Sequence, residues 1–376
     1  MRTGFAVLVL LLVFCAGSVF AQDATPEPPA GLAAGSGLIS GPVTGEAQSL
    51  NGAGATFPAV LYTRWVAEYA AITGVSVNYQ AIGSGGGIKS ISDGTVDFGA
   101  SDGPMTDEQL ATAPDHILHI PTALGGVVPV YNLPELPAGS EPLRFTAETL
   151  AGIYLGQIVM WNDPLLVAEN PQLETLDRYI IVVRRSDGSG TTNIWTSYLT
   201  AVSETWANEV GAANSVAWPV GIGGQGNSGV AGVVKQTPDS IGYVELAYAE
   251  QNELTFGSVQ NSAGNFILAN TESVSLAAAG VELPEDMRVK LVNAVGEDAY
   301  PIAGFTWLLV YENQTDQAKS LALVRFLWWA THDGQQFNES LGYSPLPQVA
   351  IAAAERLINT ITINGEPALP VELRGE

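Results

Sequence analysis

The sequence of 376 residues has one cysteine and three histidines. The cysteine, Cys15, lies in an N-terminal segment that has the features of an export signal. Once that segment is removed the mature chain has no cysteine, which excludes disulfides, thiol nucleophiles and thiolate metal sites. The histidines are His116, His119 and His332, and because no third ligand stands near the first two, the sequence predicts no metal site.

Basic residues are also scarce, with 14 Lys and Arg against 38 Asp and Glu, for a formal net charge of −24. This charge disfavours nucleic acid and anionic membrane surfaces as partners. It also means that any anion site must be local, built from donors aimed at the ligand within a Debye length of roughly 8–10 Å. Hydrophobic residues make up 47% of the chain, which is typical of a globular protein, and the length suits two domains or one large one.

The only long hydrophobic run of the sequence, residues 5–14, is too short for a membrane-spanning helix of about 20 residues. With Arg2 before it and a small-residue cleavage site at Ala21, it predicts a signal peptide over 1–21. We therefore expect an exported protein, periplasmic or at the cell surface. Cys15 is either discarded with the signal or, since residues 12–15 resemble a lipoprotein cleavage box, carries a lipid anchor.

Residues 22–48 are rich in Pro, Gly and Ala and show no apolar periodicity, so we expect a flexible linker. Beyond it, strand and helix patterns alternate. Apolar residues recur every three to four positions over 61–72, which predicts a helix with Thr56 as its N-cap and Gly74 after its end. A strand pattern and a second glycine-rich turn, 82–87, follow. Strand–loop–helix units of this kind predict an α/β fold with mostly parallel sheets.

In such sheets ligands bind beyond the carboxyl ends of the strands. Thr56, Ser84, Asp102 and the loop that begins at Arg185 are all expected at this edge. Four strand ends or helix starts would then offer polar groups to one cleft. A further glycine-rich turn, 223–229, is by itself weak evidence of a ligand site.

The loop 185–192 is the strongest candidate for anion binding. It follows an apolar strand pattern at 179–183 and opens a helical pattern at 191–199, so the first N–H groups of that helix have no backbone partner. These donors, the helix dipole and Arg185 together attract an anion. Asp187 either orients the guanidinium through a charge-assisted hydrogen bond, or forms a solvated turn with it.

Asp102 is at first the wrong residue for an anion site, because a carboxylate repels a dianion. It helps only when the ligand carries a proton to donate, as hydrogen phosphate does and sulfate at neutral pH does not. A buried acceptor that faces an unprotonated ligand stays unsatisfied, so such a site discriminates strongly. The alternative interpretation is that Asp102 is an N-cap for the following turn.

Other chemistries fit the loops less well. Residues 52–57 and 83–90 lack the glycines that dinucleotide and nucleotide phosphate loops require. Ser84 and Ser189 lack the glycine two residues earlier that a serine-hydrolase nucleophile elbow requires.

Four segments resemble the binding segments of periplasmic phosphate-binding proteins: 52–58 (GAGATFP), 82–84 (IGS), 97–102 (DFGASD) and 185–191 (RSDGSGT). Two more, 241–245 (IGYVE) and 296–302 (GEDAYPI), also resemble that family, in order. The likeness covers about residues 49–348. It implies a two-lobed type II periplasmic binding protein fold and delivery of inorganic phosphate to the membrane subunits of an ABC importer. We expect a monomer that needs no cofactor or metal.

Matched position by position, the resemblance implies a set of phosphate ligands: Thr56, Phe57 through its backbone N–H, Ser84, Asp102, Arg185, Ser189, Gly190 through its backbone N–H, and Thr191. Asp187 matches the family's partner of the arginine. Chain crossings near residues 125 and 301 suggest a two-strand hinge, with lobe I formed by 49–125 plus 302–376 and lobe II by 126–301.

We therefore expect an extracytoplasmic phosphate-binding protein without catalysis. A phosphatase that acts on phosphate esters through the same pocket is the alternative function. A binding protein that serves adhesion or sensing, with no transporter, is a third.

Overall fold

Strands and helices alternate along the chain in the computed structural model, which describes residues 39–137 and 139–374. The predicted signal peptide, Cys15 and the first part of the predicted linker lie outside the described residues. The helices are α1 (Ala59–Thr73), α2 (Ser84–Ser92), α3 (Asp107–Thr112), α4 (Ala147–Leu155), α5 (Pro164–Glu169), α6 (Gly190–Val202), α7 (Glu204–Glu209), α8 (Gly226–Gln236), α9 (Leu246–Gln251), α10 (Thr271–Ala278), α11 (Gln317–Thr331) and α12 (Gln348–Thr360).

The main sheet has nine strands: β1 (Ser49–Gly54), β2 (Ser76–Ala81), β3 (Phe98–Ser101), β4 (Ile117–Asn132), β6 (Ile181–Arg185), β7 (Ile222–Gly224), β8 (Ser240–Glu245), β9 (Thr255–Phe256) and β12 (Ala303–Tyr311). Two small sheets join β5 (Arg144–Phe145), β10 (Ser258–Gln260) and β11 (Phe266–Ile267), and β13 (Asn313–Gln314), β14 (Thr362–Ile363) and β15 (Glu366–Pro367).

The order of the main sheet is β2-β1-β3-β12-β4-β8-β6-β7, with β9 paired to β4. Its two flanks are parallel, because β1 pairs with β2 and β3, and β6 pairs with β7 and β8, in the same direction. The pairs that join the flanks, β3–β12, β12–β4 and β4–β8, are antiparallel. The α/β class predicted from the sequence is confirmed, but the sheet is mixed and not mostly parallel, because the long central pairs of β4 and β12 are antiparallel.

Strand β4 runs through the whole centre of the sheet. It pairs with β12 over residues 117–126 and with β8 over 127–132. The sequence suggested breaks at Pro121 and at the glycines 125 and 126, yet the strand is continuous and buried up to residue 131. The ladder absorbs the proline by a register shift between Thr306 and Trp307 of β12, and such a bulge changes the direction in which a side chain points.

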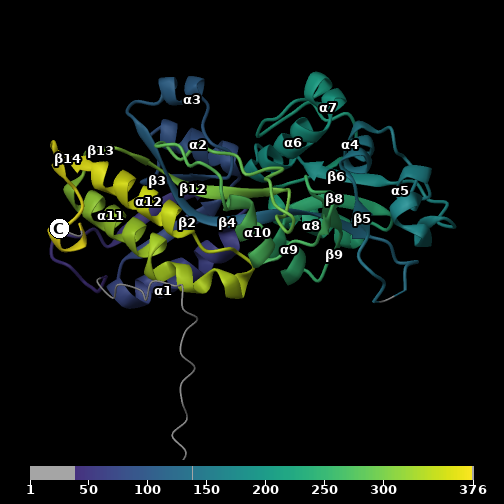
Figure 1. The fold of residues 1–376 in the computed structure, drawn as a ribbon. Helices are drawn as coiled ribbons and strands as arrows, with labels where there is room; N and C mark the ends of the chain where they lie inside the picture. Colours follow the sequence, from purple (N-terminus) through teal and green to yellow (C-terminus); the bar gives the residue numbers. More distant parts are fainter. Residues whose placement is uncertain (1–38, 138, 375–376) are drawn as a thin grey trace, which may run out of the picture. The chain divides into compact units, whose positions relative to one another are not determined.

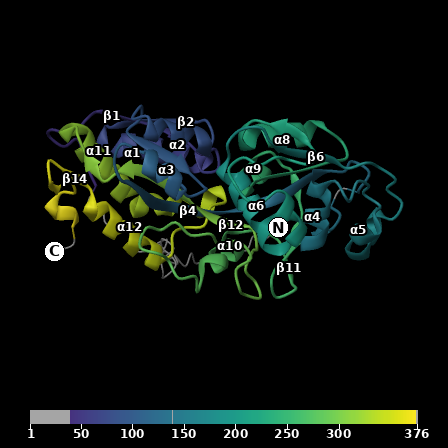
Figure 2. The same cartoon turned by 90° about the horizontal axis from the view of Figure 1, so that it is seen from above.

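The helices surround the two flanks of the sheet separately (Figures 1 and 2). Helices α1, α2 and α11 pack on β1, β2 and β3, whereas α6 and α8 pack on β6 and β8. Large aromatic side chains such as Trp65, Trp195 and Trp329 are fully buried in the core between the helices and the sheet.

Within residues 39–137 and 139–374, no helix is both long and apolar enough to cross a membrane.

This topology brings strand ends from the two flanks together. Strands β1 and β3 end at Gly54 and Ser101, and β6, which runs in the opposite direction, ends at Arg185. Each of the three runs directly into a loop that carries predicted site residues. The expectation of a single sheet edge was therefore wrong for the Arg185 loop, which meets the other loops from the opposite flank. Since β1 and β3 are parallel neighbours, their carboxyl ends meet at the same edge of the sheet.

The last ten residues of the predicted linker, 39–48, are packed and not free. Ile39 is buried in the core, and Glu46 forms a buried ion pair with Arg325 of α11, Oε1 to Nε at 2.9 Å. Arg325 also donates to the carbonyl of Ser40, and Ala47 donates to the carbonyl of Ala318. The linker prediction was therefore wrong for this part, because contacts with residues about 280 positions away order a segment that has no periodicity of its own.

We predict that Glu46→Gln destabilises the protein by about 3 kcal/mol, because it leaves the Arg325 guanidinium buried without its counter-charge. Urea unfolding with an unchanged m-value measures the loss. The matched control is Glu68→Gln, in the exposed Arg64–Glu68 pair, for which we expect a loss under about 1 kcal/mol. Equal losses for the two variants would show that the buried Glu46–Arg325 pair contributes no more to stability than an exposed one.

Candidate functional site

The loop that begins at Arg185 joins β6 to α6. Strand β6 ends at Arg185, and Ser189 is the N-cap of α6, its Oγ accepting the N–H of Thr192 at 3.1 Å. The next N–H, that of Gly190, donates to Ser84 Oγ at 2.9 Å, although Ser84 is 106 residues away in sequence. The start of α6 thus faces a residue from the other flank of the sheet.

Asp187 holds the guanidinium of Arg185 by two bonds. Arg185 Nε donates to Asp187 Oδ1 at 2.7 Å and Nη2 donates to Oδ2 at 2.5 Å. Burial raises the pKa of Asp187, but the hydrogen bonds and the charge of Arg185 outweigh it and hold this pKa below its usual value. Arg185 Nη1 is left to point at Thr191 Oγ1, 3.4 Å away. Since the Arg185 side chain is 1% exposed, the pair is not a solvated turn.

Asp102 follows β3 and is 3% exposed. Its Oδ1 accepts from Thr306 Oγ1 at 3.0 Å and its Oδ2 from Ser84 Oγ at 3.4 Å. Burial raises the pKa of Asp102 to about 7, although the Thr306 hydrogen bond and the charge of Arg185 oppose the shift. The alternative interpretation, an N-cap for the following turn, is wrong, because the Asp102 carboxylate accepts from Thr306 and Ser84, and the N–H of Gly103 in that turn donates to Ser101 Oγ.

Thr56 and Phe57 lie between β1 and α1. Thr56 was expected to cap α1, but that helix has no side-chain cap, and Thr56 Oγ1 instead accepts from the backbone N and the Nδ2 of Asn227. The hydroxyls of Tyr248 and Tyr343 donate to the carbonyls of Thr56 and Phe57, each at 2.6 Å. The carbonyl of Thr56 and the N–H of Phe57 belong to one peptide group, and in a trans peptide they point in opposite directions. Because the carbonyl faces Tyr248, the N–H of Phe57 points away from Tyr248.

The eight predicted ligand residues are all buried: Thr56, Phe57, Ser84, Asp102, Arg185, Ser189, Gly190 and Thr191. Their approach is close enough to require glycine at position 190. A Cβ there would lie 2.5 Å from Asp102 Oδ2 and 2.6 Å from Ser84 Oγ. The structure therefore brings the donors of the Arg185 loop and the acceptor Asp102 into one buried cluster.

The sequence of residues 40–331 matches the family model of the PBP superfamily domain. The phosphate-binding protein PstS of Pasteurella multocida is 45% identical over 311 residues, which cover 82% of this chain and 89% of that protein. The PstS of Haemophilus influenzae is also 45% identical, over 80% of this chain and 90% of that protein. This chain belongs to the PstS family of phosphate-binding proteins.

The fold of this PstS family member is also similar to a solved structure. That structure is of a high affinity periplasmic phosphate-binding protein with bound phosphate. It is 20% identical, with a TM-score of 0.67, and the match covers 85% of this chain and 100% of the other. The fold is therefore that of a type II periplasmic binding protein, as the motifs implied.

Four side chains of this PstS family member belong to the cluster but were not singled out from the sequence: Asn227, Tyr248, Thr306 and Tyr343. Asn227 lies in the glycine-rich turn 223–229, for which the sequence alone predicted no role. Thr306 lies inside an apolar strand, where nothing in the local pattern marks it. Its hydroxyl reaches Asp102 next to the register shift in β12.

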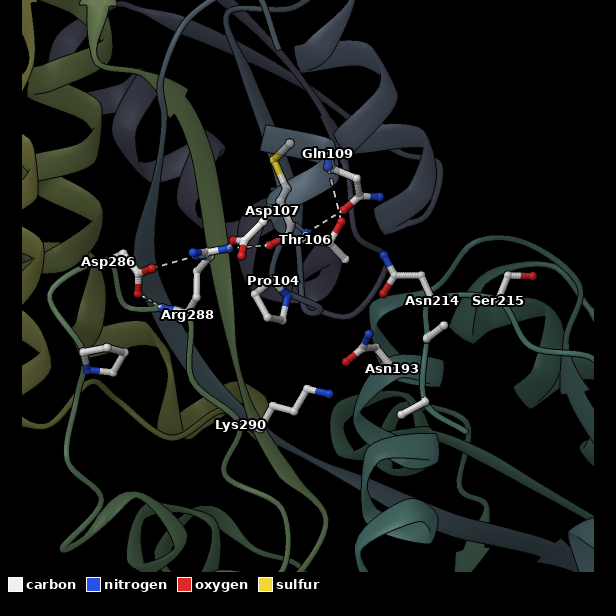
Figure 3. A pocket seen from close by; sticks show the side chains of 14 residues that line it. Pro104, Thr106, Asp107, Gln109, Asn193, Asn214, Ser215, Asp286, Arg288 and Lys290 are labelled. Atoms are coloured by element: carbon white, nitrogen blue, oxygen red, sulfur yellow. Dashed lines mark hydrogen bonds and ion pairs between the residues drawn. The ribbon is translucent and has the colours of Figure 1, made fainter. Parts of the chain in front are cut away.

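A pocket of about 710 Å³ lies beside this cluster, lined by the start of α3, residues 212–215 and residues 284–290 (Figure 3). Asn193 and Lys290 line this pocket and also a small space that reaches Asp102. Arg288 is paired with two carboxylates, Asp107 and Asp286, at 2.7 and 2.8 Å, which more than offset its charge. Lys290 points toward the pocket in Figure 3. The pocket thus adjoins the acceptor side of the cluster.

The histidines take part in structural contacts. His119 is buried and accepts the N–H of Met105 at Nε2, and burial lowers its pKa to about 3, so it is neutral at physiological pH. His116 contacts Glu312 and His332 contacts Glu355, each at 2.9 Å. In the part of the chain that the structure describes, no three His, Cys, Asp or Glu side chains are grouped as metal ligands.

We predict that Asp102→Asn stabilises the ligand-free protein at pH 8 by about 2–4 kcal/mol. Burial on folding raises the pKa of Asp102 from 3.8 to about 7. Between these values the folded state holds a proton that the unfolded chain has lost, so stability is lost as pH rises from about 4 through 7. The asparagine buries no charge and escapes this loss.

Urea unfolding of both proteins in phosphate-free buffer, from pH 5 to 8, tests this prediction. The difference between the variant and the wild type should grow with pH and level off above 7. A difference that stays constant over this range would mean that the Asp102 pKa is not raised by folding.

Proposed function

We propose that this chain binds inorganic phosphate in the buried cluster and delivers it to an ABC importer. The observation that supports this most directly is the buried carboxyl of Asp102 beside a set of donors. The donors are the hydroxyls of Thr56, Ser84, Ser189 and Thr191, the guanidinium of Arg185, and the backbone N–H groups of Phe57 and Gly190. Asp187 positions the arginine.

The chemistry of the cluster favours phosphate over sulfate. A site built only from hydrogen-bond donors would bind either anion, because both present oxygens with lone pairs. Asp102 needs a partner that brings a proton, and only phosphate carries one at neutral pH. As a carboxylate, Asp102 can accept a hydrogen bond from this proton. Sulfate offers this carboxylate no proton, so the two negative groups repel each other and sulfate binds more weakly than phosphate.

Proteins of the PstS family are named for binding and not for catalysis, and no observation favours the phosphatase alternative. In the described residues Ser84 Oγ and Ser189 Oγ contact Asp102, Gly190 and Thr192, and not a histidine base. A chromogenic phosphate ester, tested with and without divalent metals, should release no phosphate.

The proposal includes several features of the whole protein. The chain is exported through residues 1–21 and works as a periplasmic or cell-surface monomer, either freed of Cys15 or anchored by a lipid on it. Its partners are the membrane subunits of the importer. The two lobes, 49–125 plus 302–376 and 126–301, close on phosphate about a hinge in β4 and in the chain near 301, just before β12. The switch of β4 partners from β12 to β8 at residue 127 supports this hinge.

Calorimetric titration of the mature chain is the first test. We expect micromolar or tighter binding of phosphate, which corresponds to about 8 kcal/mol or more, because a few hydrogen bonds to a charged ligand, at roughly 1.5–3 kcal/mol each, suffice. Sulfate should bind at least 100-fold more weakly. Equal affinities for the two anions would contradict the role of Asp102 as the hydrogen-bond acceptor for the proton of phosphate.

Two variants separate attraction from discrimination. Arg185→Ala should weaken phosphate and sulfate alike by roughly 100-fold or more, because it removes a buried charge and leaves Asp187 facing the ligand. Asp102→Asn should reduce the difference between the phosphate and sulfate affinities, since an amide does not require a proton from the ligand. Matched controls are Arg64→Ala and Asp93→Asn, in exposed ion pairs, which should change neither affinity. If the ratio of phosphate to sulfate affinity is the same in Asp102→Asn as in the wild type, Asp102 does not discriminate between the two anions.

A further inference from the structure

Asn227 has a fully buried side chain at the start of α8, and three partners use its amide. Its Nδ2 donates to Thr56 Oγ1 at 2.9 Å and to Thr191 Oγ1 at 3.0 Å. Its Oδ1 accepts the backbone N–H of Glu245 at 2.9 Å. Thr56 precedes α1 and Thr191 lies in α6, so one amide connects two predicted ligands that are 135 residues apart in sequence.

The orientation of this amide is determined by its surroundings. The N–H of Glu245 can only donate, so the atom that faces it must be the amide oxygen. A flipped amide would set its NH₂ group against that N–H and lose the bond. The NH₂ group of Asn227 therefore faces the two threonines, and each of its hydrogens has a hydroxyl oxygen as partner.

This arrangement determines what the two hydroxyls can do. A threonine hydroxyl has one hydrogen to donate and two lone pairs to accept with. Thr56 Oγ1 accepts from both Nδ2 and the backbone N of Asn227, at 2.9 and 3.2 Å. Thr191 Oγ1 accepts from Asn227 Nδ2 and from Arg185 Nη1, at 3.0 and 3.4 Å. Because both lone pairs of each oxygen are engaged, each hydroxyl can only donate to a further partner.

We propose that Asn227 is a positioning residue that makes Thr56 and Thr191 obligate donors and so determines which oxygen of the ligand carries the proton. This inference rests on the proposed function. Oxygens that face the two threonines must present lone pairs, as must those that face Arg185 and the N–H groups. The protonated oxygen of phosphate is then directed to Asp102, whose carboxylate is the acceptor of the cluster.

The glycine-rich turn before α8 allows Asn227 to reach this position. Gly226 has φ of +69°, in the left-handed region that favours glycine. A Cβ on Gly224 would lie 2.6 Å from the backbone N of Val230, and one on Gly226 would lie 3.2 Å from Thr56 Cγ2. The turn thus packs against both its own helix and Thr56, which accounts for glycine at these two positions.

A double-mutant cycle tests whether Asn227 acts through the threonines. Phosphate affinity is measured by calorimetry for the wild type, Asn227→Leu, Thr56→Val with Thr191→Val, and the triple variant. Asn227→Leu keeps the approximate volume of the side chain but has no donor. We expect it to weaken phosphate binding roughly 10- to 100-fold in the wild type. In the valine background, which has no hydroxyls to orient, the same substitution should change the affinity less than about 3-fold.

Asn227→Asp provides a second, sharper readout. A carboxylate accepts and does not donate, so both threonine hydrogens turn toward it and away from the ligand. We expect a loss of more than about 100-fold, larger than that of Asn227→Leu. Asn193→Asp is the matched control, because it adds the same charge beside the cluster without contacting either threonine. Its loss should be smaller than that of Asn227→Asp.

The outcomes distinguish this inference from the proposed function. If the wild type binds no phosphate, the proposed function fails. If the wild type binds phosphate but Asn227→Leu costs the same in both backgrounds, Asn227 acts on the structure and not through the hydroxyls, and the inference is overturned. Thermal denaturation checks that each variant folds, and Asn227→Ala replaces Asn227→Leu in the cycle if the leucine variant does not.

Discussion

The carboxyl group of Asp102 is buried between the hydroxyls of Thr306 and Ser84. Burying an ionised carboxylate raises its free energy, and the pKa of this group rises to about 7 as a result. Arg185, on the other side of the cluster, attracts negative charge. A place that holds both an acid near its titration point and an array of donors suits a ligand that is itself both protonated and anionic.

The rest of the fold brings this acid and these donors together from two flanks of one sheet. Asp102 and Ser84 follow strands of the β1–β3 flank, and the Arg185 loop follows β6 of the other. Contacts between the flanks are short because position 190 has no Cβ. Asn227 adds a constraint of a different kind, since its amide determines the direction of hydroxyl hydrogens and not only the positions of atoms.

Features carried by local spacing were predictable from the sequence. Arg185 and Asp187 are two residues apart, and the strand–loop–helix pattern around them places both at a helix start. Features that depend on distant partners were not. Asn227 finds Thr56 at a separation of 171 residues, and residues 39–48 are ordered by Arg325 across about 280. The local sequence carries no information about such a distant partner. An asparagine, or a segment without periodicity, therefore has the same local sequence pattern whether it is packed or free.

The central claim is that the Asp102 carboxylate accepts a hydrogen bond from the protonated oxygen of bound phosphate, and a crystal structure of the phosphate complex at high resolution tests it most directly. The account predicts one phosphate oxygen at about 2.5–2.7 Å from an Asp102 carboxylate oxygen, the length of a charge-assisted O–H···O⁻ bond. The other oxygens should lie on Arg185, the threonine hydroxyls and the N–H groups of the two loops. A phosphate bound with Asp102 turned away, or separated from it by more than about 3.5 Å, would contradict the account.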